Sequence, residues 1–352
     1  MRIRQEKTID RCRFCFMCRH VCSVARVTHE ESVTPRSQGL VMSLINRDAA
    51  KPEPDVIKNI YDCTQCRWCA EWCEGGWDFS ACIVAAREAL REENLVPAAV
   101  LEQIERLVRQ PKPEAPQTAT LVLAEPIWVD GAAAQTGQAE AILRHAGLAC
   151  AATTAPSAVF ALYALGARAE AASSLAQLIA AIKGSGCQTV VALSPADAYA
   201  LRELPAILDV TSLPESVAVV SWPDQIQKLI QDKLLAPKPA EATFTWHDDD
   251  FSARYTHETA ALPAILKAIP EATVAEPTWK GNHAHSSGGA SCGCSDPAII
   301  AKLASQRLSE LQATGAGRII TATADDAALL ARSAQADVSV ETLTELVASW
   351  IK

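Results

Sequence analysis

Thirteen cysteines occur in this chain of 352 residues, and eight of them precede residue 74 in two groups of four. The first group is Cys12, Cys15, Cys18 and Cys22, and the second is Cys63, Cys66, Cys69 and Cys73. Both groups have the spacing C-x2-C-x2-C-x3-C. A zinc site uses one or two pairs of ligands and does not need this spacing twice, whereas a cubane [4Fe–4S] cluster needs four thiolates around a compact core. The spacing therefore predicts two [4Fe–4S] clusters rather than a pair of zinc sites.

The order of the cysteines resembles the two-cluster ferredoxin pattern, in which the fourth cysteine of each run ligates the other cluster. We therefore expect one cluster on Cys12, Cys15, Cys18 and Cys73, and the other on Cys63, Cys66, Cys69 and Cys22. Two one-electron centres held this close together would form a relay. Proline usually follows the fourth cysteine, but Ser23 and Glu74 stand there. Because proline is not a ligand, we expect both sites to persist.

Basic residues surround the first group of cysteines. Residues 1–30 contain seven Lys and Arg against three Asp and Glu, in a chain with a net charge of -9. Positive charge beside thiolates raises a cluster's reduction potential, which is one interpretation. A solvated basic face or a docking patch is an equally good one, and the sequence leaves both open.

A second candidate metal site lies near residue 290, where His283 and His285 precede Cys292 and Cys294. Imidazole and thiolate both suit zinc and iron, so these four residues are predicted as possible ligands. The alternative is a flexible, Gly- and Ser-rich surface loop without a metal. Cys82, Cys150 and Cys187 are interpreted as small core residues. The acidic residues 248–250 are interpreted as a solvated loop or a helix cap.

The composition excludes several classes of protein. Hydrophobic residues make up 49% and charged residues 21%, which is typical of a globular chain and argues against disorder. The acidic net charge argues against nucleic acid as a partner. No run approaches about 18 apolar residues, and the N-terminus has no apolar signal segment, so we expect a cytoplasmic protein without a transmembrane helix. We found no dinucleotide-binding, P-loop or nucleophile-elbow pattern.

Two Pro-rich stretches, QPKPEAPQ and APKPAEA, divide the chain into three segments. We expect a mostly helical cluster-binding domain over residues 1–109, and α/β lobes over 118–235 and 243–352. Each lobe opens with a strand-like run, TLVLAEP or ATFTWHD, and closes with a strand and an amphipathic helix. The alternation of strands and helices predicts parallel sheets, and the similar order of elements predicts a duplicated unit.

Taken together, the doubled cysteine run, the segment TPRSQGLVMSLI and the two α/β repeats resemble one known family. This family includes the iron–sulfur subunits of glycolate oxidase and of anaerobic glycerol-3-phosphate dehydrogenase, together with heterodisulfide reductase subunits. Its members join a two-cluster ferredoxin domain to two cysteine-rich "CCG" repeats. The resemblance implies an electron-transfer subunit that serves a flavin-dependent dehydrogenase.

The chain departs from this family in both repeats. The family's His-Asp-Pro-Cys element is represented by residues 247–250, its Cys-Cys-Gly element by residues 286–289, and its Cys-Pro-x-Cys element by residues 323–326 and 194–197. These positions carry hydroxyl and carboxylate side chains where an iron–sulfur core needs thiolates. We infer that both repeats are degenerate and hold no cluster.

The predicted function is therefore a non-catalytic subunit that relays electrons from a flavin-dependent dehydrogenase to an electron-transfer flavoprotein or a quinone pathway. One alternative is a redox enzyme subunit with its own metal or flavin site in the C-terminal repeats. Another is a regulatory or structural protein whose clusters only stabilise the fold.

Overall fold

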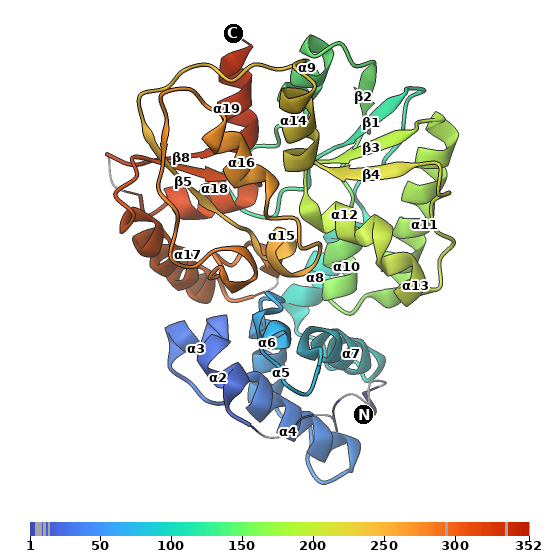
Figure 1. Cartoon of the computed structure of the whole chain (residues 1–352). Helices are drawn as coiled ribbons and strands as arrows, with labels where there is room; N and C mark the ends of the chain where they lie inside the picture. The colour runs from blue at the N-terminus through green and yellow to red at the C-terminus, as the bar shows by residue number, and fades with distance from the viewer. Residues whose placement is uncertain (4–8, 10–11, 13–14, 293–294, 335–336, 352) are drawn as a thin grey trace.

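The computed structural model describes the chain except for residues 4–8, 10–11, 13–14, 293–294, 335–336 and 352. A helical region lies at one end of the molecule, drawn in blue in Figure 1, and two α/β lobes lie side by side at the other. The chain therefore has the helical N-terminal region and the two α/β lobes that the sequence predicts.

The helical region contains α2 to α8. Their bounds are α2 Met17–Val21, α3 Ser23–Thr28, α4 Pro35–Asn46, α5 Pro54–Asp62, α6 Trp68–Glu71, α7 Phe79–Glu92 and α8 Ala98–Val108. The Thr34 side chain caps α4, and Pro35 occupies its first turn. The Asp78 side chain caps α7 in the same way. Such caps satisfy the free N–H groups at a helix start, so they fix where the cysteine loops end.

The first lobe surrounds a four-stranded sheet. Its elements are β1 Thr120–Leu123, α9 Thr136–His145, β2 Cys150–Ala152, α10 Val159–Ala164, α11 Arg168–Ser185, β3 Thr189–Ala192, α12 Pro195–Arg202, α13 Leu204–Leu208, β4 Ala218–Ser221 and α14 Trp222–Gln231. The strand order is β2-β1-β3-β4, and all the pairings are parallel. Every residue of β1 is buried, as expected for a central strand of a sheet covered on both faces.

The second lobe has a sheet of the same kind. Its elements are β5 Thr243–His247, α15 Asp250–Arg254, α16 Ala261–Lys267, β6 Thr273–Val274, the 3-10 turns Gly281–His283 and Gly289–Ser291, α17 Pro297–Gln312, β7 Arg318–Thr321, α18 Ala324–Ala331, β8 Ser339–Thr342 and α19 Leu343–Trp350. The strand order is β6-β5-β7-β8, again parallel, so the first strand of each lobe lies between its second and third.

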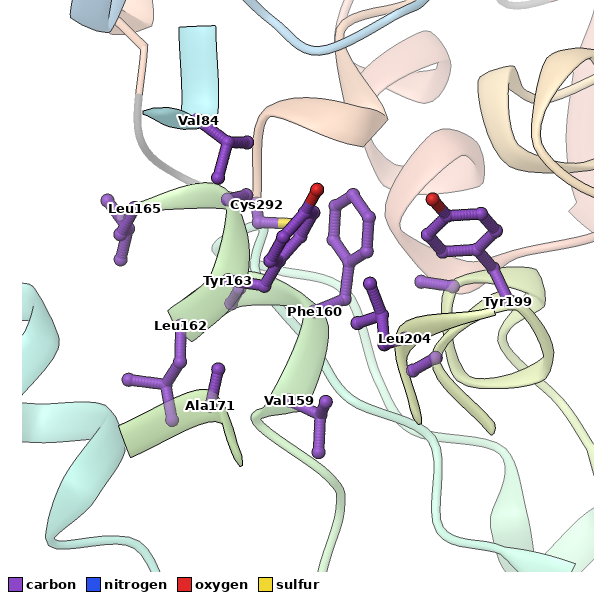
Figure 2. Packing of buried hydrophobic residues seen from close by; sticks show 14 of the residues in the cluster. Val84, Val159, Phe160, Leu162, Tyr163, Leu165, Ala171, Tyr199, Leu204 and Cys292 are labelled. Carbon is purple, nitrogen blue, oxygen red and sulfur yellow. The ribbon is translucent and has the colours of Figure 1, made fainter. Parts of the chain in front are cut away.

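The hydrophobic core crosses from one unit to the next. One cluster includes Ile83 of α7, Leu165 of the first lobe and Phe251 of the second. Figure 2 shows part of this cluster, with Cys292 beside Tyr163 of α10. Another cluster joins the two lobes through Trp222 and Phe244. Because side chains of all three units share these cores, each unit depends on the others for its packing. None of the described helices is both long and apolar enough to cross a membrane.

Candidate metal centre

One cavity of the helical region is lined by five cysteines from both runs. These are Cys12, Cys15, Cys18, Cys69 and Cys73, and the cavity between them measures about 130 Å³. Met17, Trp77 and Phe79 contribute apolar walls. Cys15 is exposed, so this cavity lies near the surface of the molecule.

A second cavity, of about 20 Å³, is lined by Cys22, Cys63, Cys66 and Cys69. Cys69, Pro35 and Phe79 line both cavities, so the two are immediate neighbours. When the shared Cys69 is counted with the second cavity, each cavity has one cysteine from the opposite run. This is the grouping that the crossed pattern predicts, and ligation itself stays a prediction.

The buried thiols resist ionisation. Burial raises the pKa of both Cys18 and Cys63 to about 11, and it raises the pKa of Cys22 and Cys69 well above the ordinary range. Neighbouring thiols add to the effect: Cys63 and Cys66 act on Cys22, and Cys12, Cys15 and Cys73 act on Cys18. Charged thiolates in these cavities therefore require a positive partner, and a bound metal cluster is the partner that cysteine chemistry supplies.

Hydrogen bonds already reach several of the sulfur atoms. The Ser23 hydroxyl lies 3.3 Å from Cys66 Sγ, and the Trp77 backbone N–H donates to Cys73 Sγ over 3.3 Å. Such hydrogen bonds favour the more negatively charged, reduced form of an iron–sulfur centre. Trp77 also donates its indole N–H to the buried Cys82 Sγ at 2.9 Å, which confirms that Cys82 is a core thiol.

Three side chains from other elements hold the backbone of residues 63–66, which we call the ligand loop. Arg87 donates to the Cys63 carbonyl at 2.8 Å, the Tyr255 hydroxyl donates to the Gln65 carbonyl at 2.6 Å, and Arg254 donates to the Cys66 carbonyl. Gln65 and Arg67 both have left-handed backbone conformations, with φ of 59° and 56°. The loop is thus held in a strained shape by donors from α7 and from the end of α15.

Sequence reasoning missed these three donors. Arg87 is fully buried, and the sequence signal for it is an arginine inside the mostly apolar run IVAAREAL. No local pattern marks Arg254 or Tyr255, because the atoms that they hold belong to a segment almost two hundred residues earlier.

Arg254 is itself anchored in the second lobe. Its guanidinium pairs with Asp250, whose carboxylate also accepts a hydrogen bond from Ser286. Asp249 caps α15 by accepting from the N–H groups of Phe251 and Ser252 at 2.9 Å. Asp248, Asp249 and Asp250 are all buried. The helix-cap interpretation of this run is therefore confirmed for Asp249, and the solvated interpretation is wrong, because the lobe packs against the helical region at this point.

The two histidines near residue 290 contact tryptophans of the helical region. The His285 ring lies 4.7 Å from both Trp68 and Trp279, and it contacts Arg26 at 3.0 Å and Glu310. His283 packs against Trp72 with ring centroids 5.3 Å apart. The described part of this segment forms an interface, so the interpretation as a surface loop is wrong.

Among the described residues of that predicted metal site, Cys292 does not form a group with the two histidines. Cys292 is buried in the core, and its carbonyl accepts from Gln103; Cys294 lies outside the described residues. Within the described ranges no set of three or more His, Cys, Asp or Glu side chains converges on a position for a single metal ion. A metal at these four residues stays a prediction.

Hydrogen-bonded polar side chains occupy the positions of the second lobe that the sequence resemblance matches to repeat cysteines. Asp326 accepts from Ser287 and, at 2.6 Å, from Thr323, while its Oδ1 lies 3.7 Å from His247 Nε2. Arg307 donates to His247 Nδ1 at 3.1 Å. These residues include no thiol, and among the described residues His247 Nε2 and Arg307 Nη2 have no hydrogen-bond partner.

In each lobe, one carboxylate accepts hydrogen bonds from backbone N–H groups of the other lobe. Glu125 of the first lobe accepts from the Ala324 N–H at the start of α18, at 3.1 Å. Asp325 of the second lobe accepts from the N–H groups of Trp128 and Val129 at 3.1 and 3.0 Å. Each lobe therefore supplies a buried carboxylate to the other, which fixes their relative position.

Comparison with known proteins bears on both halves of the chain. Residues 8–77, which include all eight cysteines of the two runs, match the family model of the 4Fe-4S dicluster domain. No curated protein matches the chain. A crystal structure of a hypothetical protein from Helicobacter pylori is similar, with a TM-score of 0.66 at 9% identity over 89% of this chain and 67% of that one. This likeness shows a shared fold.

Two further solved structures overlap less well. Glutamate racemase isoform RacE1 from Bacillus anthracis has a TM-score of 0.31 at 12% identity, over 66% of this chain and 79% of that one. A putative Asp/Glu racemase from Yersinia pestis has a TM-score of 0.31 at 14% identity, over 66% of this chain and 96% of that one. The cysteine-lined cavities and the dicluster match together indicate an iron–sulfur protein with [4Fe–4S] chemistry.

Proposed function

We propose that this chain is an electron-transfer subunit with two [4Fe–4S] clusters. The observation that carries the proposal is that the eight cysteines line two adjacent cavities, which share Cys69. Cys12, Cys15, Cys18 and Cys73 would hold cluster 1, and Cys22, Cys63, Cys66 and Cys69 would hold cluster 2. Bound there, the clusters supply one-electron redox chemistry.

The protein's own residues would position the ligands and exclude water. Arg87, Arg254 and Tyr255 hold the backbone of the ligand loop. Trp77 and Phe79 line the first cavity with apolar side chains. At the second cavity, Arg254 and Tyr255 of the second lobe hold the carbonyls of Cys66 and Gln65. Electrons would therefore enter or leave more readily at the first cavity, where Cys15 is exposed.

The finer assignments rest on the family resemblance. We propose a flavin-dependent dehydrogenase as the electron donor, and an electron-transfer flavoprotein or a quinone pathway as the acceptor, in the cytoplasm. The chain would be non-catalytic, with a cluster-binding domain over 1–109 and related repeats over 118–235 and 243–352. The shared strand order of the two sheets supports a duplicated unit.

Metal analysis and electron paramagnetic resonance test this function. Anaerobically purified chain should contain about eight iron and eight sulfide per polypeptide, with clusters that dithionite reduces. Cys22→Ser and Cys66→Ser should remove the same paramagnetic component, and Cys18→Ser and Cys73→Ser should remove the other. Cys187→Ser, at a buried thiol that lines neither cavity, is the control. An iron-free protein, or clusters that accept no electrons from dithionite, would refute the proposal. Bound flavin or zinc would favour the enzymatic alternative.

A further inference from the structure

The first cavity opens onto an exposed apolar face of the helical region. Phe16 and Met17 directly follow the exposed Cys15, and they are 53% and 36% exposed. On α4, Leu40 and Leu44 are 44% and 37% exposed. We call these four residues the α2–α4 face. It lies at the end of the molecule farthest from the two sheets (Figure 1).

Arg36 links the two parts of this face. Arg36, Leu40 and Leu44 are spaced four residues apart on α4, so they lie along one side of that helix. The Arg36 guanidinium lies 4.5 Å from the centre of the Phe16 ring, which joins this stripe to the start of α2. Isolated apolar side chains are ordinary on a protein surface, but four together beside a redox ligand suggest a binding site.

The charge around this face is opposite to that of the whole chain. The described residues up to residue 47 include five Arg against two Glu, while the chain has a net charge of -9. Arg19 and Arg36 both pair with the same acid, Glu31, at 2.7 and 3.6 Å. The rim of the face is therefore basic, and a partner with an acidic surface would be attracted to it.

The cysteines that line only the other cavity are less exposed. Cys22, Cys63 and Cys66 are half-buried, whereas Cys15 of the first cavity is exposed. Cys15 is therefore the ligand that a protein partner could reach most directly.

We propose that the α2–α4 face is the docking surface for an acidic one-electron redox protein, which exchanges electrons with cluster 1. This inference rests on the proposed function. One electron passes from the reduced partner to the oxidised cluster, or in the reverse direction, with no bond made or broken. A small apolar centre with a charged rim suits the brief complexes that electron carriers form.

Stopped-flow spectroscopy with the anaerobic holoprotein tests the proposal. Flavodoxin, a small acidic one-electron carrier, is the probe. Electron exchange is followed in the direction that is thermodynamically favourable. The second-order rate should fall as ionic strength rises, because opposite charges steer the encounter. Leu40→Asp should slow the exchange at least about fivefold by repulsion and lost apolar contact. Leu101→Asp, on α8 at 42% exposure, is the matched control and should keep the wild-type rate.

Iron content, midpoint potentials and the rate of dithionite reduction should be the same in both variants. A Leu40→Asp rate equal to that of wild type, or a wild-type rate that does not fall with salt, would overturn the docking surface while leaving the proposed function intact. Clusters that dithionite itself cannot reduce would instead overturn the proposed function.

Discussion

Arg87 is the residue on which the second cavity most depends. Its guanidinium donates to the carbonyls of Ile60, Tyr61, Cys63 and Ala164, so it connects α5, the ligand loop and α10. A carbonyl that loses its donor inside a protein costs more than the net gain of the bond, because water cannot replace the donor there. The ligand loop and the first lobe are therefore stabilised by the same side chain.

Arg87→Met should lower the free energy of unfolding by roughly 3 kcal/mol or more, because several carbonyls lose their donors together. The variant should also retain less iron, since the ligand loop is no longer held. Denaturant unfolding and iron analysis of the anaerobic protein measure both effects. Arg91→Met, one turn later on α7, removes only a partly exposed pair with Glu170 and should cost no more than about 1 kcal/mol. Equal effects of the two variants would contradict this account of Arg87.

Asp197 gives the stability of the first lobe a dependence on pH. Burial raises the pKa of this carboxyl from 3.8 to about 7, although a hydrogen bond from Ser157 opposes the change. Its Oδ2 has no hydrogen-bond partner among the described residues. Because the folded state favours the neutral acid, the stabilisation is complete below about pH 4 and is lost as the pH rises through 7.

Asp197→Asn should flatten this dependence. Between pH 5.5 and 8 the wild-type free energy of unfolding should fall by roughly 2 kcal/mol more than that of the variant. Urea unfolding at the two pH values measures the difference. Asp209→Asn, at a carboxylate that is 92% exposed, is the control and should follow the wild type. Parallel curves for Asp197→Asn and wild type would show that the buried acid does not cause the effect.

At the scale of elements, α7 and the α10–α11 turn approach each other too closely for any side chain at Gly166. A Cβ atom there would lie 2.6 Å from the Arg87 carbonyl carbon and the Glu88 nitrogen, and Gly166 has a φ of +78°. Both the contact and the backbone conformation require glycine. This contact sets the distance between the helical region and the first lobe.

Gly166→Ala should therefore destabilise the protein by more than about 2 kcal/mol, through backbone strain and the displacement of α7. Gly147→Ala is a matched control, because Gly147 has a φ of +82° with open space where the Cβ would be. It should cost only about 1 kcal/mol. Thermal unfolding of both variants decides the matter: a similar loss in each would mean that conformation alone, and not the α7 contact, requires the glycine.

Most of the elements were predictable because their signals are local. TLVLAEP and ATFTWHD became β1 and β5, and the closing strand and amphipathic helix of each lobe became β4 with α14 and β8 with α19. Residues 248–250 were misread as possibly solvated because charge alone suggests solvent. What buries them is packing of the second lobe against a segment remote in sequence, and no local pattern records it.

For the whole molecule, the cavity linings agree with the cysteine grouping expected from the ferredoxin-like pattern, apart from Cys69, which lines both cavities; ligation by these residues stays a prediction. The spacing carries no information about the donors that shape the ligand loop, or about the exchange of Glu125 and Asp325 between lobes. These depend on the docking of three units, which only the complete fold defines.

The second lobe should keep its architecture, and the protein its iron, when its polar network is disturbed. Asp326→Ala removes the acceptor of Ser287 and Thr323 and should cost roughly 1–3 kcal/mol of stability. Iron per chain should equal that of wild type, because Asp326 lines neither cysteine cavity. Metal analysis of the folded variant measures this, and a loss of iron would mean that the repeats hold metal after all.

Arg254 and Tyr255 lie 188 and 190 residues beyond the carbonyls that they hold. On the ribosome, the Cys63–Cys66 segment therefore emerges long before the groups that give it its final shape. Loading of the second cavity would have to wait until the last lobe has been synthesised, whereas the cysteines of the first cavity are all available early. Biogenesis of the two centres should thus be sequential, with the surface site filled before the interior one.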